Sequence, residues 1–87
     1  MKIIKFTALW CADCIVMRPM WTEIKNKYPD LVIEEYDFDD HMEIAASYQI
    51  KKVPHTIFID HEGNELSRIE GLKNRQELLN IIEELLS

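Results

Sequence analysis

Residues 10–14 read WCADC, and they contain both cysteines of the 87-residue chain. An apolar run at residues 3–9 precedes this motif, and a helical pattern at residues 15–28 follows it. A Cys-x-x-Cys pair at a strand-to-helix junction suits thiol–disulfide chemistry, because the free N–H groups at a helix N-terminus stabilise the attacking thiolate. The motif therefore predicts a redox-active pair, with the rest of the chain as its scaffold.

Composition narrows the classes of function. A chain of 87 residues is long enough for one domain, and we expect residues 1–87 to form it. The net charge is −6 and no basic stripe is visible, which argues against a nucleic-acid partner. We expect no membrane partner, because no apolar run approaches the roughly 20 residues that span a bilayer. We expect no leader segment, because the N-terminus does not show a charged stretch followed by an apolar core and a cleavage site. The expected compartment is the cytoplasm, where a Cys-x-x-Cys pair is more often catalytic or metal-binding than structural.

Apolar periodicity and turn residues predict a βαβαββα order of elements. The expected strands are residues 2–8, 31–37, 56–59 and 65–69, and the expected helices are residues 11–28, 40–47 and 75–86. The first two strands should run parallel through a right-handed crossover, and the short turn at residues 60–64 should make the last two an antiparallel hairpin. The charges of the second strand suit a sheet edge, because they discourage pairing with other chains.

Local signals mark the helix ends and one bend. Pro19 lies inside the first helix and should kink it, because proline lacks the backbone donor. Asp40 should begin the second helix with Glu43 as its capping-box partner, and Asn74 should cap the last helix with Glu77. The apolar residues expected on the buried side of the last helix are Leu78, Leu79, Ile81, Ile82, Leu85 and Leu86.

The chain resembles the thioredoxin family over nearly its whole length. The Trp-Cys-x-x-Cys motif follows the first strand, Pro19 stands five residues after the second cysteine, and Val53-Pro54 matches the family's cis-proline dipeptide before the third strand. Gly63 and Gly71 match family glycines near the last hairpin, where Gly71 should supply a bulge or a close backbone approach. The resemblance implies an α/β, thioredoxin-like fold with a four-stranded mixed sheet, ordered second–first–third–fourth and flanked by three helices. The N-terminal strand and helix of a full-length thioredoxin are missing.

The resemblance implies a thiol–disulfide oxidoreductase that reduces protein disulfides. Its clients would be disulfide-containing proteins, and a flavin reductase of the thioredoxin-reductase kind would supply its electrons. We expect a monomer with no cofactor beyond the redox-active Cys11–Cys14 disulfide. The cis-proline dipeptide of the family faces the active site. We therefore expect Trp10 and Pro54 to contact the client, and Val53 to offer its backbone N–H and C=O groups to an extended client segment.

The motif assigns different roles to the two cysteines. Cys11 would sit at the helix N-terminus, where the dipole favours its thiolate, so we expect it to be the nucleophile. Cys14, one turn further on and less exposed, would resolve the mixed disulfide by closing the Cys11–Cys14 bridge. Asp13 lies between them, and its carboxylate opposes a nearby thiolate, which should make the dithiol a stronger reductant. A plainer interpretation, compatible with the first, is that an acid in the first turn favours the helix dipole.

Several positions depart from the family pattern. Ala12-Asp13 replaces the usual Gly-Pro, and His55 replaces the threonine after the cis-proline. Lys5 stands where thioredoxins have a buried acid, and Glu35 where they have a lysine, which amounts to a charge swap. We expect Lys5 and Glu35 to meet beneath the motif, either as a structural ion pair or as the group that takes the proton of the resolving cysteine. His55 is either a proton carrier or client contact, or a strand residue that faces solvent.

Two alternative functions stay open. A glutaredoxin-like reductase would use glutathione, although Trp10 and the lack of Pro-Tyr between the cysteines argue against it. A non-catalytic or metal-handling module would bind a metal through the cysteines, with His41, His55 and His61 as further ligands. These histidines lack the paired spacing of a zinc module, so we expect no metal.

Overall fold

One four-stranded sheet, in the order β2-β1-β3-β4, organises the chain. The structure is a computed structural model that describes all residues from 1 to 87. Along the chain the elements are β1 (Lys2–Thr7), α1 (Ala12–Lys27), β2 (Val32–Asp37), α2 (Met42–Ser47), β3 (His55–Ile59), β4 (Glu65–Glu70) and α3 (Arg75–Leu86). β1 and β2 run parallel, whereas β3 is antiparallel to both β1 and β4. The predicted order of elements, mixed sheet and strand order are confirmed.

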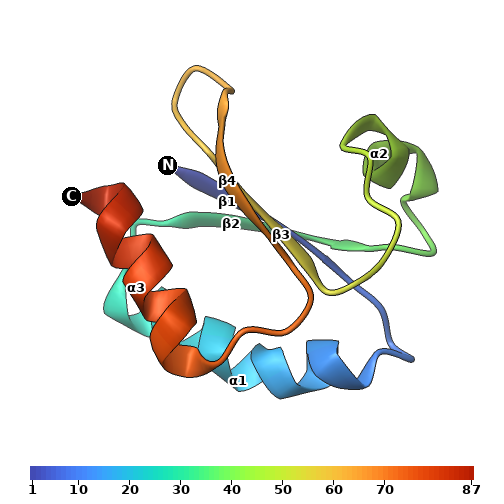
Figure 1. The fold of residues 1–87 in the computed structure, drawn as a ribbon, viewed down its shortest axis with the longest axis horizontal. Helices are drawn as coiled ribbons and strands as arrows, with labels where there is room; N and C mark the ends of the chain where they lie inside the picture. The colour runs from blue at the N-terminus through green and yellow to red at the C-terminus, as the bar shows by residue number, and fades with distance from the viewer.

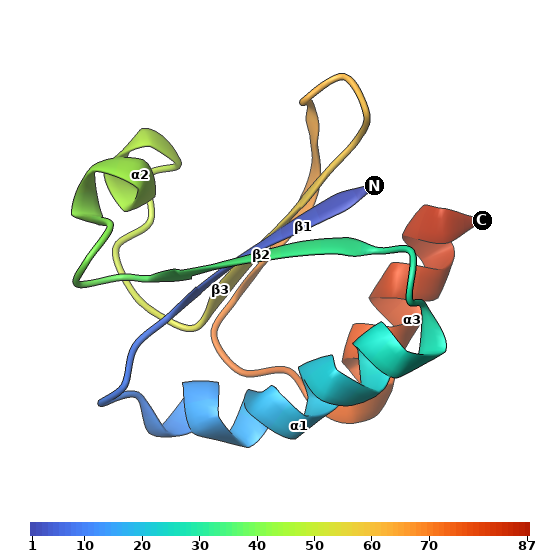
Figure 2. The ribbon, with the colours of Figure 1, turned by 180° about the vertical axis from the view of Figure 1, so that it is seen from behind.

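The two faces of the sheet are covered differently. α1 and α3 lie across one face, whereas the short α2 and the β3–β4 turn lie on the side of the other (Figure 1). The view from behind shows the same division (Figure 2). Successive residues of a strand point to opposite faces, so the strands contribute side chains to two apolar clusters, one on each face. Ile3 and Phe58 pack on the α1–α3 side, and Ile4 and Ile57 on the α2 side.

β1 is a central strand and β2 is an edge strand. Ile3, Ile4 and Phe6 of β1 are at most 2% exposed, as expected for a strand covered on both faces. β2 carries the charged residues Glu34 and Glu35, so its free edge discourages pairing with another chain. The predicted edge position of this strand is therefore confirmed.

α3 is capped as the sequence predicts. The Asn74 side chain accepts a hydrogen bond of 2.9 Å from the backbone N–H of Glu77, which satisfies a free donor of the first turn. The buried residues of this helix are Leu78, Leu79 and Ile82. Leu86, predicted on the buried side, is 42% exposed at the end of the last turn. None of the three helices is long and apolar enough to cross a membrane.

α2 begins differently from the predicted Asp40–Glu43 capping box. Its N-cap is His41, whose side chain makes no capping hydrogen bond. The carboxylate of Asp37, at the end of β2, instead accepts hydrogen bonds from the backbone N–H groups of Asp39 and Asp40, at 2.9 and 3.3 Å. Asp37 thereby organises the β2–α2 turn, because a short acidic side chain can bind backbone donors two and three residues on. Asp40 is a turn residue and does not start the helix.

Gly71 acts through its backbone conformation. Its φ is +82°, in the left-handed region that glycine adopts without strain. A Cβ at this position would meet no atom within 4 Å, and the irregularity in β3–β4 pairing lies at Phe58 and Ile59. The prediction of a bulge or a close backbone approach at Gly71 is therefore wrong. The N–H of Gly71 donates to the carbonyl oxygen of Pro54 at 2.8 Å, which ties the end of β4 to the start of β3.

Candidate functional site

The two cysteines meet at the start of α1. Cys11 is the N-cap residue, with an extended backbone, and Cys14 lies in the first turn. The Cys11 Sγ accepts a hydrogen bond of 3.2 Å from the backbone N–H of Cys14. The sulfur of Cys11 therefore lies where the helix dipole and a free N–H group favour negative charge. Both cysteines are free thiols.

Cys14 is the cysteine that holds its proton tightly. Cys11 is 6% exposed and Cys14 is 4% exposed, so the expected difference in exposure is small. Burial, together with a hydrogen bond to the Cys11 side chain, raises the pKa of Cys14 to about 12. The charge of Asp13 acts in the same direction. Cys14 is therefore protonated at neutral pH and needs a proton acceptor before it can attack a disulfide.

The Val53–Pro54 dipeptide lies against the cysteines. Its peptide bond is cis, as the family resemblance implies. Val53 packs against the small apolar cluster that Ala8 forms with the two cysteines. Pro54 is buried and lines the same cavity as Cys14. The segment before β3 and the start of α1 thus form two sides of one site.

Lys5 and Glu35 meet on the α1 side of the sheet. They are partners in the β1–β2 register, and Lys5 Nζ lies 3.9 Å from Glu35 Oε1. Lys5 is buried, whereas the Glu35 side chain is 54% exposed and also accepts a hydrogen bond from Thr7 Oγ1 at 3.3 Å. Burial lowers the pKa of Lys5, while the Glu35 carboxylate opposes that shift. The ammonium also lies 5.0 Å from the ring centroid of Trp21, a cation–π contact.

A small cavity joins Cys14 to this ion pair. Its volume is about 10 Å³, which is near the lower limit for one water molecule. Its lining residues are Lys5, Phe6, Thr7, Cys14, Met17, Arg18, Trp21, Glu35, Pro54 and Thr56. The sequence analysis did not single out Thr7 or Arg18. The signal for Arg18 was its position four residues after Cys14, on the same side of the helix.

Trp10 is exposed beside the cysteines. The residue is 67% exposed, and its indole Nε1 donates a hydrogen bond of 2.8 Å to Asp39 Oδ2. That bond holds one edge of the ring against the β2–α2 turn, while the rest of the side chain faces solvent. Asp13 is also exposed, in the first turn of α1. Both side chains are accessible to a partner that approaches the cysteine pair.

His55 lies on the opposite face of the sheet from Lys5. It is only 3% exposed, so the prediction that it faces solvent is wrong. It shares a face with Ile57 of the α2-side cluster, because side chains two residues apart in a strand point the same way. Its Nε2 lies 3.3 Å from Arg68 Nη1. The structure therefore does not bring the His55 ring to the cysteines, and neither a proton-carrier role at Cys14 nor a direct client contact fits this position.

The histidines and cysteines do not assemble into a metal site. No group of three or more histidine, cysteine or carboxylate side chains is arranged to hold a metal ion. His41 occupies the N-cap position of α2, with its ring beside that of Tyr36, and His55 is packed against Arg68. Neither adds a ligand to the cysteine pair.

Comparison with known proteins points to one family. The thioredoxin family model matches residues 1–84. A thioredoxin H-type from Fagopyrum esculentum is 35% identical over 80 residues, which cover 92% of this chain and 67% of that protein. A thioredoxin from Ovis aries is 31% identical over 84 residues, which cover 97% of this chain and 78% of that protein. The X-ray structure of Fasciola hepatica thioredoxin is similar with a TM-score of 0.86 and 28% identity, covering 95% of this chain and 78% of the other.

Proposed function

The chain belongs to the thioredoxin family, and we propose that residues 1–87 work as one thioredoxin-like domain in which Cys11 and Cys14 reduce the disulfides of client proteins. The protein is a thiol–disulfide oxidoreductase, as members of this family are, and such chemistry needs no cofactor beyond the cysteine pair. One observation carries the assignment of roles. The Cys11 Sγ receives the N–H of Cys14 at the helix start, which prepares this sulfur for ionisation.

The proposed cycle passes two electrons from the dithiol to the client. The Cys11 thiolate attacks one sulfur of the client disulfide, the client S–S bond breaks, and the departing client thiolate takes up a proton. Cys14, once deprotonated, attacks the Cys11 sulfur of the mixed disulfide. The Cys11–Cys14 bond forms, and the second client thiolate leaves and is protonated. A separate reductant then restores the dithiol.

One member of the Lys5–Glu35 pair is proposed to take the proton of Cys14. The support is the water-sized cavity that both residues share with Cys14, because one water there would link the thiol to the ion pair. Glu35 is half exposed and can pass a proton on to solvent. A purely structural role, in which Glu35 only offsets the buried charge of Lys5, is the alternative.

Trp10, Val53 and Pro54 are proposed to form the client-binding surface. Trp10 offers an exposed aromatic side chain, which provides contact area at a low cost in conformational entropy. Val53 packs beside the cysteines, so an extended client segment that pairs with its backbone would present a disulfide to Cys11.

Asp13 is proposed to tune the reducing power of the pair. Its negative charge destabilises a nearby thiolate and therefore the reduced form of the protein. Burial is the main cause of the raised pKa of Cys14, and the charge of Asp13 adds a smaller contribution in the same direction, which supports this proposal. The dithiol should therefore be a stronger reductant than one with a neutral residue at this position.

The proposed partners follow from the same family. Clients are disulfide-containing proteins, and electrons arrive from a flavoprotein of the thioredoxin-reductase kind. We place the protein in the cytoplasm as a monomer that takes part in electron transport and redox homeostasis. The net charge of −6 supports the absence of a nucleic-acid partner.

A trapping experiment tests the proposed cycle. In Cys14→Ser the mixed disulfide on Cys11 cannot be resolved, so clients should stay attached and be identified by mass spectrometry after non-reducing separation. The double variant Cys11→Ser/Cys14→Ser is the control and should trap nothing. A folded Cys14→Ser variant without any mixed disulfide would contradict the proposal. Insulin reduction that depends on added glutathione would favour the glutaredoxin-like alternative instead.

A further inference from the structure

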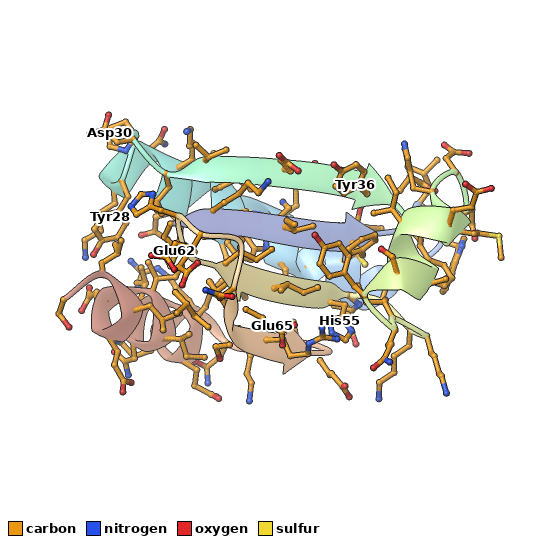
Figure 3. The ribbon with its side chains drawn as sticks, turned by 90° about the horizontal axis from the view of Figure 1, so that it is seen from above. Tyr28, Asp30, Tyr36, His55, Glu62 and Glu65 are labelled. Atoms are coloured by element: carbon orange, nitrogen blue, oxygen red, sulfur yellow. The ribbon has the colours of Figure 1, made fainter.

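Arg68 of β4 holds three groups on the α2 face of the sheet. Its Nη1 donates to the carbonyl oxygen of Tyr48 at 2.9 Å and lies 3.3 Å from His55 Nε2. Its Nε and Nη2 donate to the carboxylate of Glu65 at 2.8 and 2.6 Å. Figure 3 looks onto this face and shows His55 and Glu65 close to one another. One planar guanidinium therefore joins β4 to the start of β3 and to the end of α2.

The two groups that Arg68 reaches outside β4 bound the cis-proline segment, residues 49–54. Tyr48 is the C-cap of α2 and His55 is the first residue of β3. The segment between them contains no helix or strand, and it starts at Gln49 with a φ of +59°. Ile50 anchors the segment in the α2-side cluster, and further contacts at the two ends fix the position of its backbone. Arg68 provides such a contact at each end, and the Gly71 N–H adds one at the Pro54 carbonyl.

We propose that Arg68 is a positioning residue for client binding, which keeps the cis-proline segment beside Cys11 through its contacts with Tyr48 and His55. The contact with His55 requires the neutral form of that histidine. The inference rests on the proposed function, in which Val53 and Pro54 meet the client. Arg68 touches neither cysteine in this arrangement. It acts through the segment.

The charge state of His55 follows from hydrogen-bond chemistry. An arginine N–H can only donate, so the contact with Arg68 is a hydrogen bond only when His55 Nε2 carries no proton. The charged groups around the ring are Arg68, Glu65 and Glu70 of β4 and Lys52 of the segment. Burial first, and then Arg68, lower the pKa of His55, while the two glutamates act in the opposite direction. Protonation of Nε2 would remove the acceptor and place a second cation against Arg68. Acid therefore weakens the contact between Arg68 and His55.

The first experiment compares two substrates on reduced protein. One is a disulfide-linked dimer of an extended peptide, and the other is 5,5′-dithiobis(2-nitrobenzoate), which is too small to pair with the segment. Arg68→Lys removes Nη1, the atom that reaches both ends of the segment. Peptide reduction should therefore slow about fivefold, as expected for the loss of about one hydrogen bond, and reduction of the small disulfide by less than about twofold. Arg75→Lys is the matched control, because Arg75 binds Glu23 on the other side of the molecule. It should change neither rate.

The second experiment uses pH. The ratio of the peptide rate to the small-disulfide rate cancels the ionisation of Cys11, which affects both reactions. In the wild type this ratio should stay constant from about pH 8 down to 6.5 and fall below 6.5, because the pKa of His55 is lowered from that value and the ring is protonated only in acid. His55→Gln keeps an acceptor oxygen near the place of Nε2 and cannot titrate in this range. Its ratio should stay flat and close to the neutral-pH value of the wild type.

The outcomes separate this inference from the proposed function. If wild-type protein reduces neither substrate, the proposed function fails and the inference fails with it. If the wild type reduces both, but Arg68→Lys slows them equally or the pH profile of the ratio is flat, the proposed function stands and the positioning role is wrong. Far-ultraviolet circular dichroism of every variant shows whether it is folded. If Arg68→Lys is unfolded, the pH profiles of wild type and His55→Gln decide the question.

Discussion

Each face of the sheet buries one basic side chain, and the two side chains have partners of opposite charge. Lys5 of β1 lies on the α1 side and faces a carboxylate, Glu35, that reaches solvent. His55 of β3 lies on the α2 side and faces a cation, Arg68. The two positions are close, because His55 pairs with Phe6 in the β1–β3 register. The comparison teaches that a buried charge is kept where a counter-ion is present, whereas the base on the other face must be neutral.

His55→Lys breaks this comparison most directly. It moves a lysine of the same kind as Lys5 to the face whose nearest side-chain group is a cation. We expect a loss of roughly 3 kcal/mol in the free energy of unfolding, because the new charge is buried beside Arg68. Urea unfolding at neutral pH measures it, with His55→Gln as the uncharged control. Equal stability of His55→Lys and wild type would show that the two faces do not differ.

Lys5→Met tests the other face. Burial lowers the pKa of Lys5 below its ordinary value of 10.5, so the fold disfavours the charged form. Methionine keeps the length of the side chain without the charge, and we expect a gain of about 1 kcal/mol in the free energy of unfolding at neutral pH. The gain should shrink as the pH rises from the lowered pKa towards 10.5, because the wild-type lysine then loses its proton in the folded state. A loss of stability at neutral pH would show that the cation–π contact with Trp21 outweighs burial.

Glu35→Gln has the smallest expected effect on stability and sharpens the assignment of roles. Because the carboxylate is half exposed, we expect a change of less than about 1 kcal/mol. A proton acceptor role predicts that release of the client from the mixed disulfide slows several-fold, since glutamine cannot take a proton. Rapid-quench kinetics of client release measures that step, with Glu84→Gln on α3 as the matched control. Unchanged release kinetics in a stable variant would leave Glu35 with a structural role only.

Much of the architecture follows from local sequence signals. The parallel pairing of β1 with β2, the edge position of β2, the Asn74 cap and the meeting of Lys5 with Glu35 all agree with the predictions. Each of them depends on a short-range pattern or on the register of two strands joined through α1. The strand order and the cis Val53–Pro54 bond came from the family resemblance instead.

The sequence did not predict on which face of the sheet His55 lies. All five residues of β3 are buried, so no alternation of polar and apolar residues marks which of them face α1 and which face α2. Arg68 was missed for a related reason. Its contacts with Tyr48 and His55 span 20 and 13 residues, and a lone arginine in a strand gives no signal of such contacts. The start of α2 was misplaced because Asp40 is a good cap by residue type, whereas the turn that Asp37 organises includes Asp40 and makes His41 the N-cap.

The two tryptophans differ in their exposure to water, and this gives the protein two built-in optical reporters. Trp10, next to Cys11, is exposed, while Trp21 is buried against Lys5. An indole in water emits at longer wavelength than one in an apolar interior, so the red edge of the emission spectrum follows events around Trp10 and the blue edge follows the interior. Oxidation and client capture can therefore be timed separately in unlabelled protein.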